Sequence, residues 1–196
     1  MLGLEYPWLP LTREAWMRCK PHISHRTERC MEEPIICLKD RGLEVGLVQE
    51  ILAKLTAKDD KYACAIADKI ISESQDTDEW YEYFDGFASL LNHPKSLVRN
   101  RVLYILAANA QWDDENRFDA ILNDYLTHVI DEKPITARQC IKALAQVGKA
   151  KPQYIPKLID YLHSADLSKY KDSMRPLIEQ DIAETEKALT LYEKAN

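Results

Sequence analysis

The sequence contains few of the residues that break helices or form flexible linkers. Its 196 residues include five Gly and nine Pro, too few for Gly-rich or Pro-rich linkers of any length. No stretch approaches the roughly 20 consecutive apolar residues of a membrane-spanning helix. Residues 1–8 lack the basic region and apolar core of a signal peptide. The length suits one domain or one short repeat array, and we expect a folded protein with the cytoplasm as its default location.

The sequence also lacks the cysteine pattern of a disulfide-bonded secreted protein and the basic clusters of a nucleic-acid-binding protein. Five Cys, an odd number spread unevenly, do not form the pattern of a secreted disulfide framework. The 26 Lys and Arg are outnumbered by 32 Asp and Glu, which gives a net charge of −6. Binding to a phosphate backbone uses clustered Lys and Arg, and no basic run longer than pairs such as Arg99 and Arg101 occurs.

Motifs for catalysis and for cofactors are missing. The sequence has no Gly-rich phosphate loop and no His-Glu-x-x-His pair. Its carboxylates are numerous but spread over faces expected to be solvated. We therefore expect a protein that is not an enzyme and that holds no cofactor.

One cluster has the residue types of a metal site. Cys19, His22, His25 and Cys30 fall within twelve residues, and zinc takes thiolate and imidazole ligands. The spacing is not that of a paired zinc knuckle, and Pro21 lies inside the cluster. Zinc binding and a loop without a ligand both remain open, and we predict no metal.

Helix-start signals recur along the chain at nearly even spacing. They occur at Asn92–Arg99, Asp131–Arg138 and Lys169–Arg175, so the closing Arg residues lie 39 and 37 residues apart. A weaker copy occurs at Thr56–Ala63, which ends 36 residues before Arg99. Periods of this length are typical of stacked helical hairpins.

Apolar residues from about residue 43 onward follow helical spacing and predict four hairpins. Thr77 and Asp113 are candidate N-caps, Pro134 suits a first helical turn, and Gly148 is a stop signal. No credible strand is present, although the run 34–38 could be a helix or a strand. The eight expected helices lie near residues 45–55, 62–70, 77–91, 98–106, 118–129, 134–147, 155–162 and 173–189.

Residues 1–41 differ in composition from the rest. They carry seven basic and six acidic residues, a net charge of about +1, whereas the remaining chain sums to −7. We expect residues 1–41 to be an N-terminal extension with one short helix near residues 12–19. Residues 42–196 would form the repeat domain.

The hairpin pattern resembles HEAT repeats, and specifically short bacterial HEAT-like proteins of unassigned function, some of which are labelled SufBD-like. Three segments that resemble this smaller family are Ala107–Asp113, Asp131–Cys140 and Tyr170–Leu177, and Leu90–Arg99 resembles HEAT repeats in general. The resemblance implies an all-α fold, a right-handed α-α superhelix of the HEAT or armadillo type with about four helical hairpins. The SufBD label does not follow from these residues, because the iron–sulfur scaffold proteins of that name are β-rich.

HEAT repeats commonly pair an acidic turn residue with an Arg between neighbouring repeats. Asp131 and Arg138 fit this pattern at a spacing of seven, and Arg99 fits it with Asn92 in the acidic position. The resemblance therefore implies a partial ladder of ion pairs.

The second helices of HEAT hairpins usually line the concave side of the solenoid. If Val98, Val102 and Ile105 face inward, the repeat offsets predict a strip of small, amide and aromatic side chains that faces outward. The candidate partner-binding residues of this strip are Asp68, Asn100, Arg101, Tyr104, Gln139 and Gln180.

These observations favour a non-enzymatic protein–protein interaction or scaffold module, present as a monomer or a weak homo-oligomer. The alternative is a nucleic-acid-binding protein similar to the DNA glycosylases built from HEAT-like repeats. Such a protein would need a basic concave track, and the sum of −7 over the repeat region disfavours it.

Overall fold

The structure is a computed structural model, and it describes residues 44–195. These residues belong to one of two units into which the chain divides, Arg41–Asn196. Within this range the chain forms eight α-helices and no strand, so the prediction of an all-α fold is confirmed. The expected helix near residues 12–19, the run 34–38 and the Cys19, His22, His25 and Cys30 cluster lie outside the described residues.

The helices follow one another as antiparallel pairs joined by short connections. Four short 3-10 helices, η1 (Glu79–Tyr83), η2 (Ala110–Trp112), η3 (His128–Ile130) and η4 (Pro152–Tyr154), extend or precede the α-helices. The pairs are α2 (Glu44–Leu55) with α3 (Asp60–Glu73), α4 (Phe84–Ser89) with α5 (Ser96–Asn109), α6 (Arg117–Thr127) with α7 (Pro134–Ala150), and α8 (Ile155–His163) with α9 (Arg175–Ala195).

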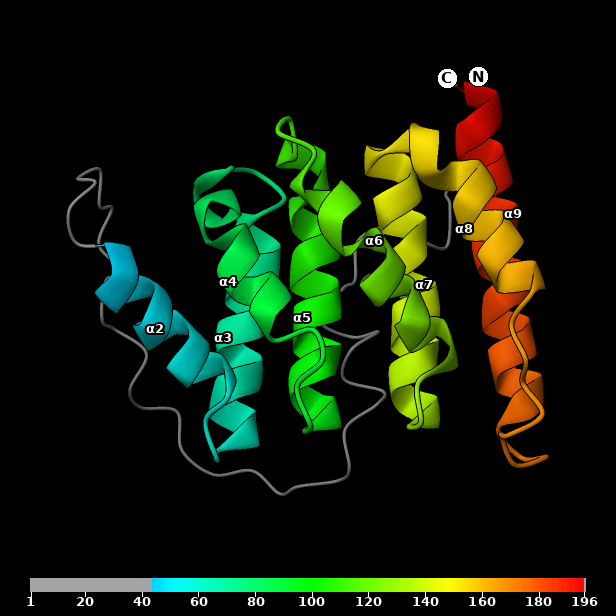
Figure 1. Ribbon diagram of the computed structural model, residues 1–196, viewed down its shortest axis with the longest axis horizontal. Helices are drawn as coiled ribbons and strands as arrows, with labels where there is room; N and C mark the ends of the chain where they lie inside the picture. The colour runs from blue at the N-terminus through cyan, green and yellow to red at the C-terminus, as the bar shows by residue number, and fades with distance from the viewer. Residues whose placement is uncertain (1–43, 196) are drawn as a thin grey trace, which may run out of the picture. The chain divides into compact units, whose positions relative to one another are not determined.

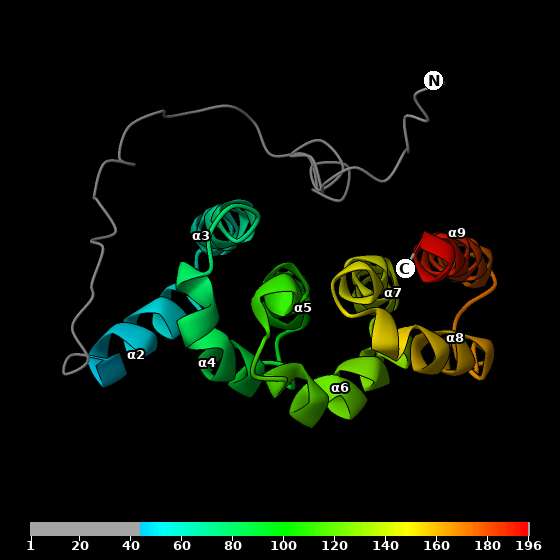
Figure 2. The ribbon, with the colours of Figure 1, turned by 90° about the horizontal axis from the view of Figure 1, so that it is seen from above.

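The pairs stand side by side in chain order and make two layers. The first layer contains α2, α4, α6 and α8, and the second layer contains α3, α5, α7 and α9, which lie along the inner side of a shallow arc (Figure 2). Within the second layer α3 packs on α5, α5 on α7 and α7 on α9. All four second-layer helices begin at the same edge and run in the same direction (Figure 1).

Local signals place most of the helix ends. The Asp59 side chain accepts hydrogen bonds from the backbone N–H groups of Lys61 and Tyr62 and caps α3. Asp113 accepts from the N–H groups of Arg117 (2.7 Å) and Phe118 (3.2 Å) at the start of α6, so its side chain satisfies the first turn, but the N-cap residue is Asn116 and not Asp113 as predicted. Pro134 opens α7, as predicted.

The expected start of the second hairpin is wrong. Thr77 does not cap a helix there; instead, its hydroxyl donates to the carbonyl of Glu73 at 3.4 Å. The segment continues as the 3-10 helix η1 before α4 begins at Phe84. Trp80 of η1 is buried together with Phe84 and Phe87 of α4.

The core lies between the two layers and also between neighbouring second-layer helices. Phe84, Phe118 and Tyr125 form a chain of ring contacts with centroids 5.9 and 5.3 Å apart. Every residue of α5 from Arg101 to Asn109 is buried. A helix that is buried on all sides is covered by neighbours on each flank, and α5 has α3 on one side and α7 on the other.

The expectation that Gly148 stops its helix is also wrong, because α7 continues to Ala150. Gly148 marks a close approach of α7 and α9: a Cβ atom there would lie 2.1 Å from Cδ2 of Leu189 and 3.4 Å from Cγ1 of Ile155. Leu189 is fully buried, so its side chain has little room to move away.

We therefore predict that Gly148→Ala destabilises the protein, although Ala is the better helix former by about 1 kcal/mol. Overpacking costs about 1–3 kcal/mol, and an approach of 2.1 Å puts the cost at the upper end, so the net loss should be up to about 2 kcal/mol in urea unfolding. Gly46 has open space around its Cα, and Gly46→Ala, the matched control, should stabilise or leave the midpoint unchanged. A stabilised Gly148→Ala would contradict the close packing of α7 and α9.

Candidate functional site

The six residues predicted to form a partner-binding strip are distributed over all four second-layer helices, but they differ in exposure. Asp68 on α3 and Gln180 on α9 are exposed, whereas Asn100 on α5 and Gln139 on α7 are half-buried. Gln180 donates to the carboxylate of Glu184 at 2.8 Å. The remaining two, Arg101 and Tyr104, are buried.

The expectation that Arg101 faces outward is wrong. Its side chain is 1% exposed and donates to the carbonyl of Leu55 (3.0 Å) and to the carboxylate of Asp60 (2.9 Å). Arg101 therefore ties α5 to the end of α2 and the start of α3. Helical spacing predicted one outward face, but packing between neighbouring hairpins covers this flank of α5.

The expectation for Tyr104 is wrong for the same reason. Tyr104 is 1% exposed, and its hydroxyl donates to the side-chain oxygen of Gln139. This hydrogen bond joins α5 to α7. The predicted strip is therefore not one continuous exposed surface, and two of its members hold the layer together.

A small groove lies further along the same helices, toward their C-terminal ends. It encloses about 170 Å³, and six residues of α5, η2 and α7 and of the segment after α3 line it: Gln75, Ala107, Gln111, Gln146, Lys149 and Ala150. We call it the amide groove. Its volume is below the roughly 300–1,000 Å³ of pockets that enclose drug-sized ligands.

Hydrogen bonds to one carbonyl fix the wall of the amide groove. The backbone oxygen of Ser74 accepts from Nε2 of Gln111 (2.6 Å) and from the indole N–H of Trp112 (2.8 Å). The Ser74 hydroxyl accepts from the buried Asn109 at 3.0 Å. These bonds tie the end of α3 to the end of α5, so the groove is bordered by rigid helix ends.

The glutamines of the amide groove were missed in the sequence, although a signal for them exists. Gln75, Gln111 and Gln146 lie 36 and 35 residues apart, close to the period of the helix-start signals. The offset of 36 that relates the first two hairpins leads from Gln75 to Gln111, and the next offset of 39 leads to Ala150, one helical turn beyond Gln146. Applying the repeat offsets to Gln75 would therefore have found Gln111 but not Gln146.

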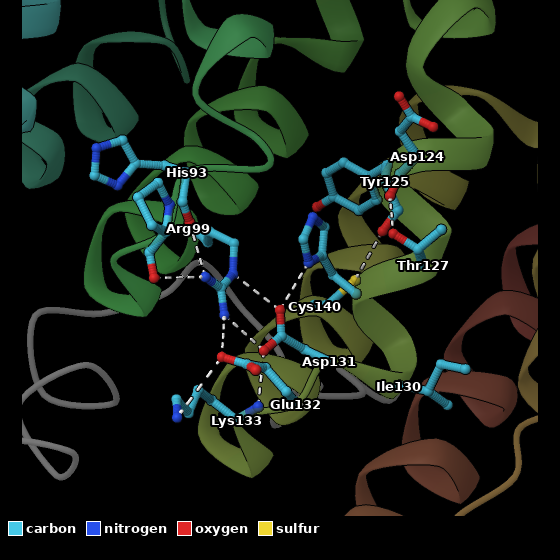
Figure 3. A network of polar contacts seen from close by, with 12 residues as sticks. His93, Arg99, Asp124, Tyr125, Thr127, Ile130, Asp131, Glu132, Lys133 and Cys140 are labelled. Atoms are coloured by element: carbon cyan, nitrogen blue, oxygen red, sulfur yellow. Dashed lines mark hydrogen bonds and ion pairs between the residues drawn. The ribbon is translucent and has the colours of Figure 1, made fainter.

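A buried ion pair joins the second hairpin to the third. Nε and Nη2 of Arg99 donate to the two carboxylate oxygens of Asp131 at 2.9 and 2.8 Å, as Figure 3 shows. The same guanidinium donates to the carbonyl of His93 at 2.8 Å. A bidentate contact between planar groups is the strongest arrangement of such a pair.

The HEAT resemblance implies ion pairs between an Arg and the acidic turn residue of a neighbouring repeat, and Arg99 forms such a pair with Asp131 of the next hairpin, while Asn92 is exposed. Arg138 instead pairs with Asp181, which lies within α9 rather than in a turn. Lys142 approaches the same Asp181 at 3.2 Å. Each pair therefore links one hairpin to the following one.

Asp131 also contacts a histidine, which suggests a catalytic dyad at first sight. Nδ1 of His128 lies 2.8 Å from Oδ2 of Asp131, and the neighbouring Cys140 is fully buried (Figure 3). Burial raises the pKa of the Cys140 thiol well above its usual value, and the thiol lies 3.4 Å from the carbonyl of Tyr125. A protonated, buried thiol is a poor nucleophile, so this geometry favours a structural role.

The charge of Asp131 is strongly stabilised. Burial by itself would raise the pKa of this carboxyl, but hydrogen bonds from His128, Arg99 and the backbone N–H of Lys133 outweigh burial. Together they hold the pKa well below its ordinary value. Asp131 is therefore ionised at neutral pH and complements the buried guanidinium of Arg99.

Across residues 44–195, no three His, Cys, Asp or Glu side chains converge as metal ligands would. Of the helices in the same range, none is both long and apolar enough to cross a bilayer. In comparisons with protein-family models, with curated proteins and with solved structures, nothing matched the chain.

Proposed function

We propose that the protein is a non-enzymatic protein-binding module of the HEAT-like solenoid type. The amide groove on the inner side of the second layer would receive its partner. Support for the solenoid comes from the four helical pairs that stack in chain order and from the ion pairs that link successive hairpins.

The observation that carries this proposal is the set of three glutamines, one from each of three successive hairpins, that line the amide groove. A glutamine side chain offers both a donor and an acceptor, as the backbone of an extended polypeptide does. Gln111 contributes only its acceptor, because its Nε2 donates to the carbonyls of Ser74 and Ala108. Neighbouring packed helices lie roughly 8–10 Å apart, so glutamines on neighbouring helices can meet peptide groups about three residues apart on one extended bound segment. The small side chains of Ala107 and Ala150 leave room for it.

Affinity capture from a native lysate tests this proposal. The Gln75→Ala/Gln146→Ala variant should bind the partner about fivefold to a hundredfold more weakly and capture correspondingly less of it, since each of the two lost hydrogen bonds contributes about 0.5–1.5 kcal/mol. Gln153, an exposed glutamine on η4 outside the groove, provides the control, and Gln153→Ala should capture as much as the original chain.

Equal capture by the groove variant and the control would remove the amide groove from consideration. A gel shift with duplex DNA distinguishes the alternative function, nucleic-acid binding, from protein binding. Duplex binding that falls steeply with salt concentration would favour a nucleic-acid-binding protein, because phosphate contacts release counterions.

A further inference from the structure

A row of exposed apolar side chains marks the edge where the second-layer helices begin. Only five large apolar residues among those described are exposed, and four of them lie in the first turns of α3, α5, α7 and α9. They are Tyr62 (45% exposed), Leu97 (44%), Ile135 (56%) and Leu177 (38%). We call these four residues the first-turn row. Its regularity, with one member per hairpin, distinguishes it from scattered surface apolar residues.

Positive charge surrounds this row. The segments that form the edge, residues 56–62, 92–101, 131–135 and 166–177, contain nine Lys and Arg against six Asp and Glu, a net +3 in a chain of −6. Asp60 and Asp131 are neutralised by Arg101 and Arg99. Six lysines are exposed along the edge: Lys58, Lys61, Lys95, Lys133, Lys169 and Lys171.

The opposite edge of the second layer carries a net negative charge. Residues 71–85, 110–117 and 149–154 form it, with nine Asp and Glu against three Lys and Arg. Of the exposed apolar set, only Leu191, near the C-terminal end of α9, lies at this edge. A second copy could therefore offer negative charge to the first-turn row through this edge, but only one apolar anchor against four.

We infer that the first-turn row docks an acidic amphipathic helix of another protein. Neighbouring second-layer helices lie roughly 8–10 Å apart, which puts the four apolar side chains on a line of roughly 30 Å. On a helix, residues seven apart recur about every 10.5 Å on one face. An acidic helix with apolar residues at this spacing would match both the spacing and the charge of the row. The inference does not depend on the amide groove.

A peptide probe tests the inference on the full chain. The probe is an acidic helical peptide of about 22 residues, long enough for the row, with Leu at heptad spacing and Glu on its other faces. It should bind the original chain, and the affinity should fall with added salt. Leu97→Ser/Ile135→Ser should weaken binding about tenfold or more, as expected for central apolar anchors.

Leu191, the fifth exposed apolar residue, lies near the other end of α9, and Leu191→Ser should change the affinity less than about twofold. Thermal unfolding of each variant shows that the fold is intact. The inference would be overturned by equal binding of a scrambled peptide, by equal binding of a Gln-for-Glu peptide, or by full binding to the double variant. Binding of phosphatidylglycerol vesicles through Leu97 and Ile135, without peptide binding, would overturn it in favour of a membrane surface.

Discussion

Asp131→Asn should lower the free energy of unfolding by about 3–5 kcal/mol, the cost of leaving a buried charge without its partner. The substitution keeps the size of the side chain but removes the charge that the guanidinium of Arg99 contacts at 2.8 and 2.9 Å. Both side chains are less than one-tenth exposed, so water cannot replace the lost carboxylate. Urea unfolding followed by circular dichroism measures the difference.

The pH dependence of unfolding provides a second measurement of the same pair. The pKa of Asp131 is lowered on folding, so its contribution to stability is fully present above the unfolded pKa of about 4. It is lost as the pH falls below that value toward the lower pKa of the folded state. Asp131→Asn should lack this part of the acid dependence.

An exposed carboxylate serves as the control for this pair. The side chain of Asp172 is 98% exposed and lies 3.5 Å from Arg175, and Asp172→Asn should leave the unfolding midpoint unchanged. Equal effects of the two substitutions would show that Asp131 is hydrated in the folded protein, contrary to the geometry of Figure 3.

Arg101→Met should cost about 2–4 kcal/mol, since it removes charged hydrogen bonds and leaves a buried carbonyl without a donor. Methionine retains the apolar stem of the side chain, so the loss measures the guanidinium contacts with Leu55 and Asp60. Lys95 provides the control, because it approaches the same Asp60 at 3.4 Å from an exposed position. Lys95→Met should change the midpoint little, as expected for a surface ion pair.

This prediction separates a structural role from a binding role at Arg101. A substitution that unfolds the end of the second layer also reduces partner capture, even if Arg101 never touches the partner. Capture by Arg101→Met should therefore recover at a temperature where the variant is fully folded. Weakened capture by a variant as stable as the original chain would show that Arg101 belongs to the binding surface.

Sequence patterns predicted the fold class well where local chemistry decides the structure. Asp113 and Pro134 mark helix starts because a cap and a fixed φ angle act within a few residues. The predictions of a helix stop at Gly148 and of an N-cap at Thr77 were wrong because the structure at these positions depends on contacts with other parts of the chain. The space beside Gly148 is filled by Leu189 of another helix, and the second hairpin starts with buried aromatic side chains.

The candidate site was harder to predict for a related physical reason. Helical periodicity separates a buried face from an exposed one, but it does not show that a helix is covered on three sides. Arg101 and Tyr104 lie on the flanks of α5, where the neighbouring hairpins bury them. Comparing hairpins by the repeat offset leads from Gln75 to Gln111, but Gln146 lies one helical turn from the position that the next offset gives, so the pattern reveals only part of the amide groove.

The burial of α5 also has a consequence for synthesis. α5 leaves the ribosome while α6 and α7, which cover part of its surface, are still inside the tunnel. Until these two helices emerge, Leu103, Ile105 and Leu106, all fully buried in the finished protein, include side chains that lack their final neighbours. Newly made chains of this length expose apolar surface to aggregation. The nascent protein is therefore most prone to aggregation while the third hairpin is still inside the ribosomal tunnel.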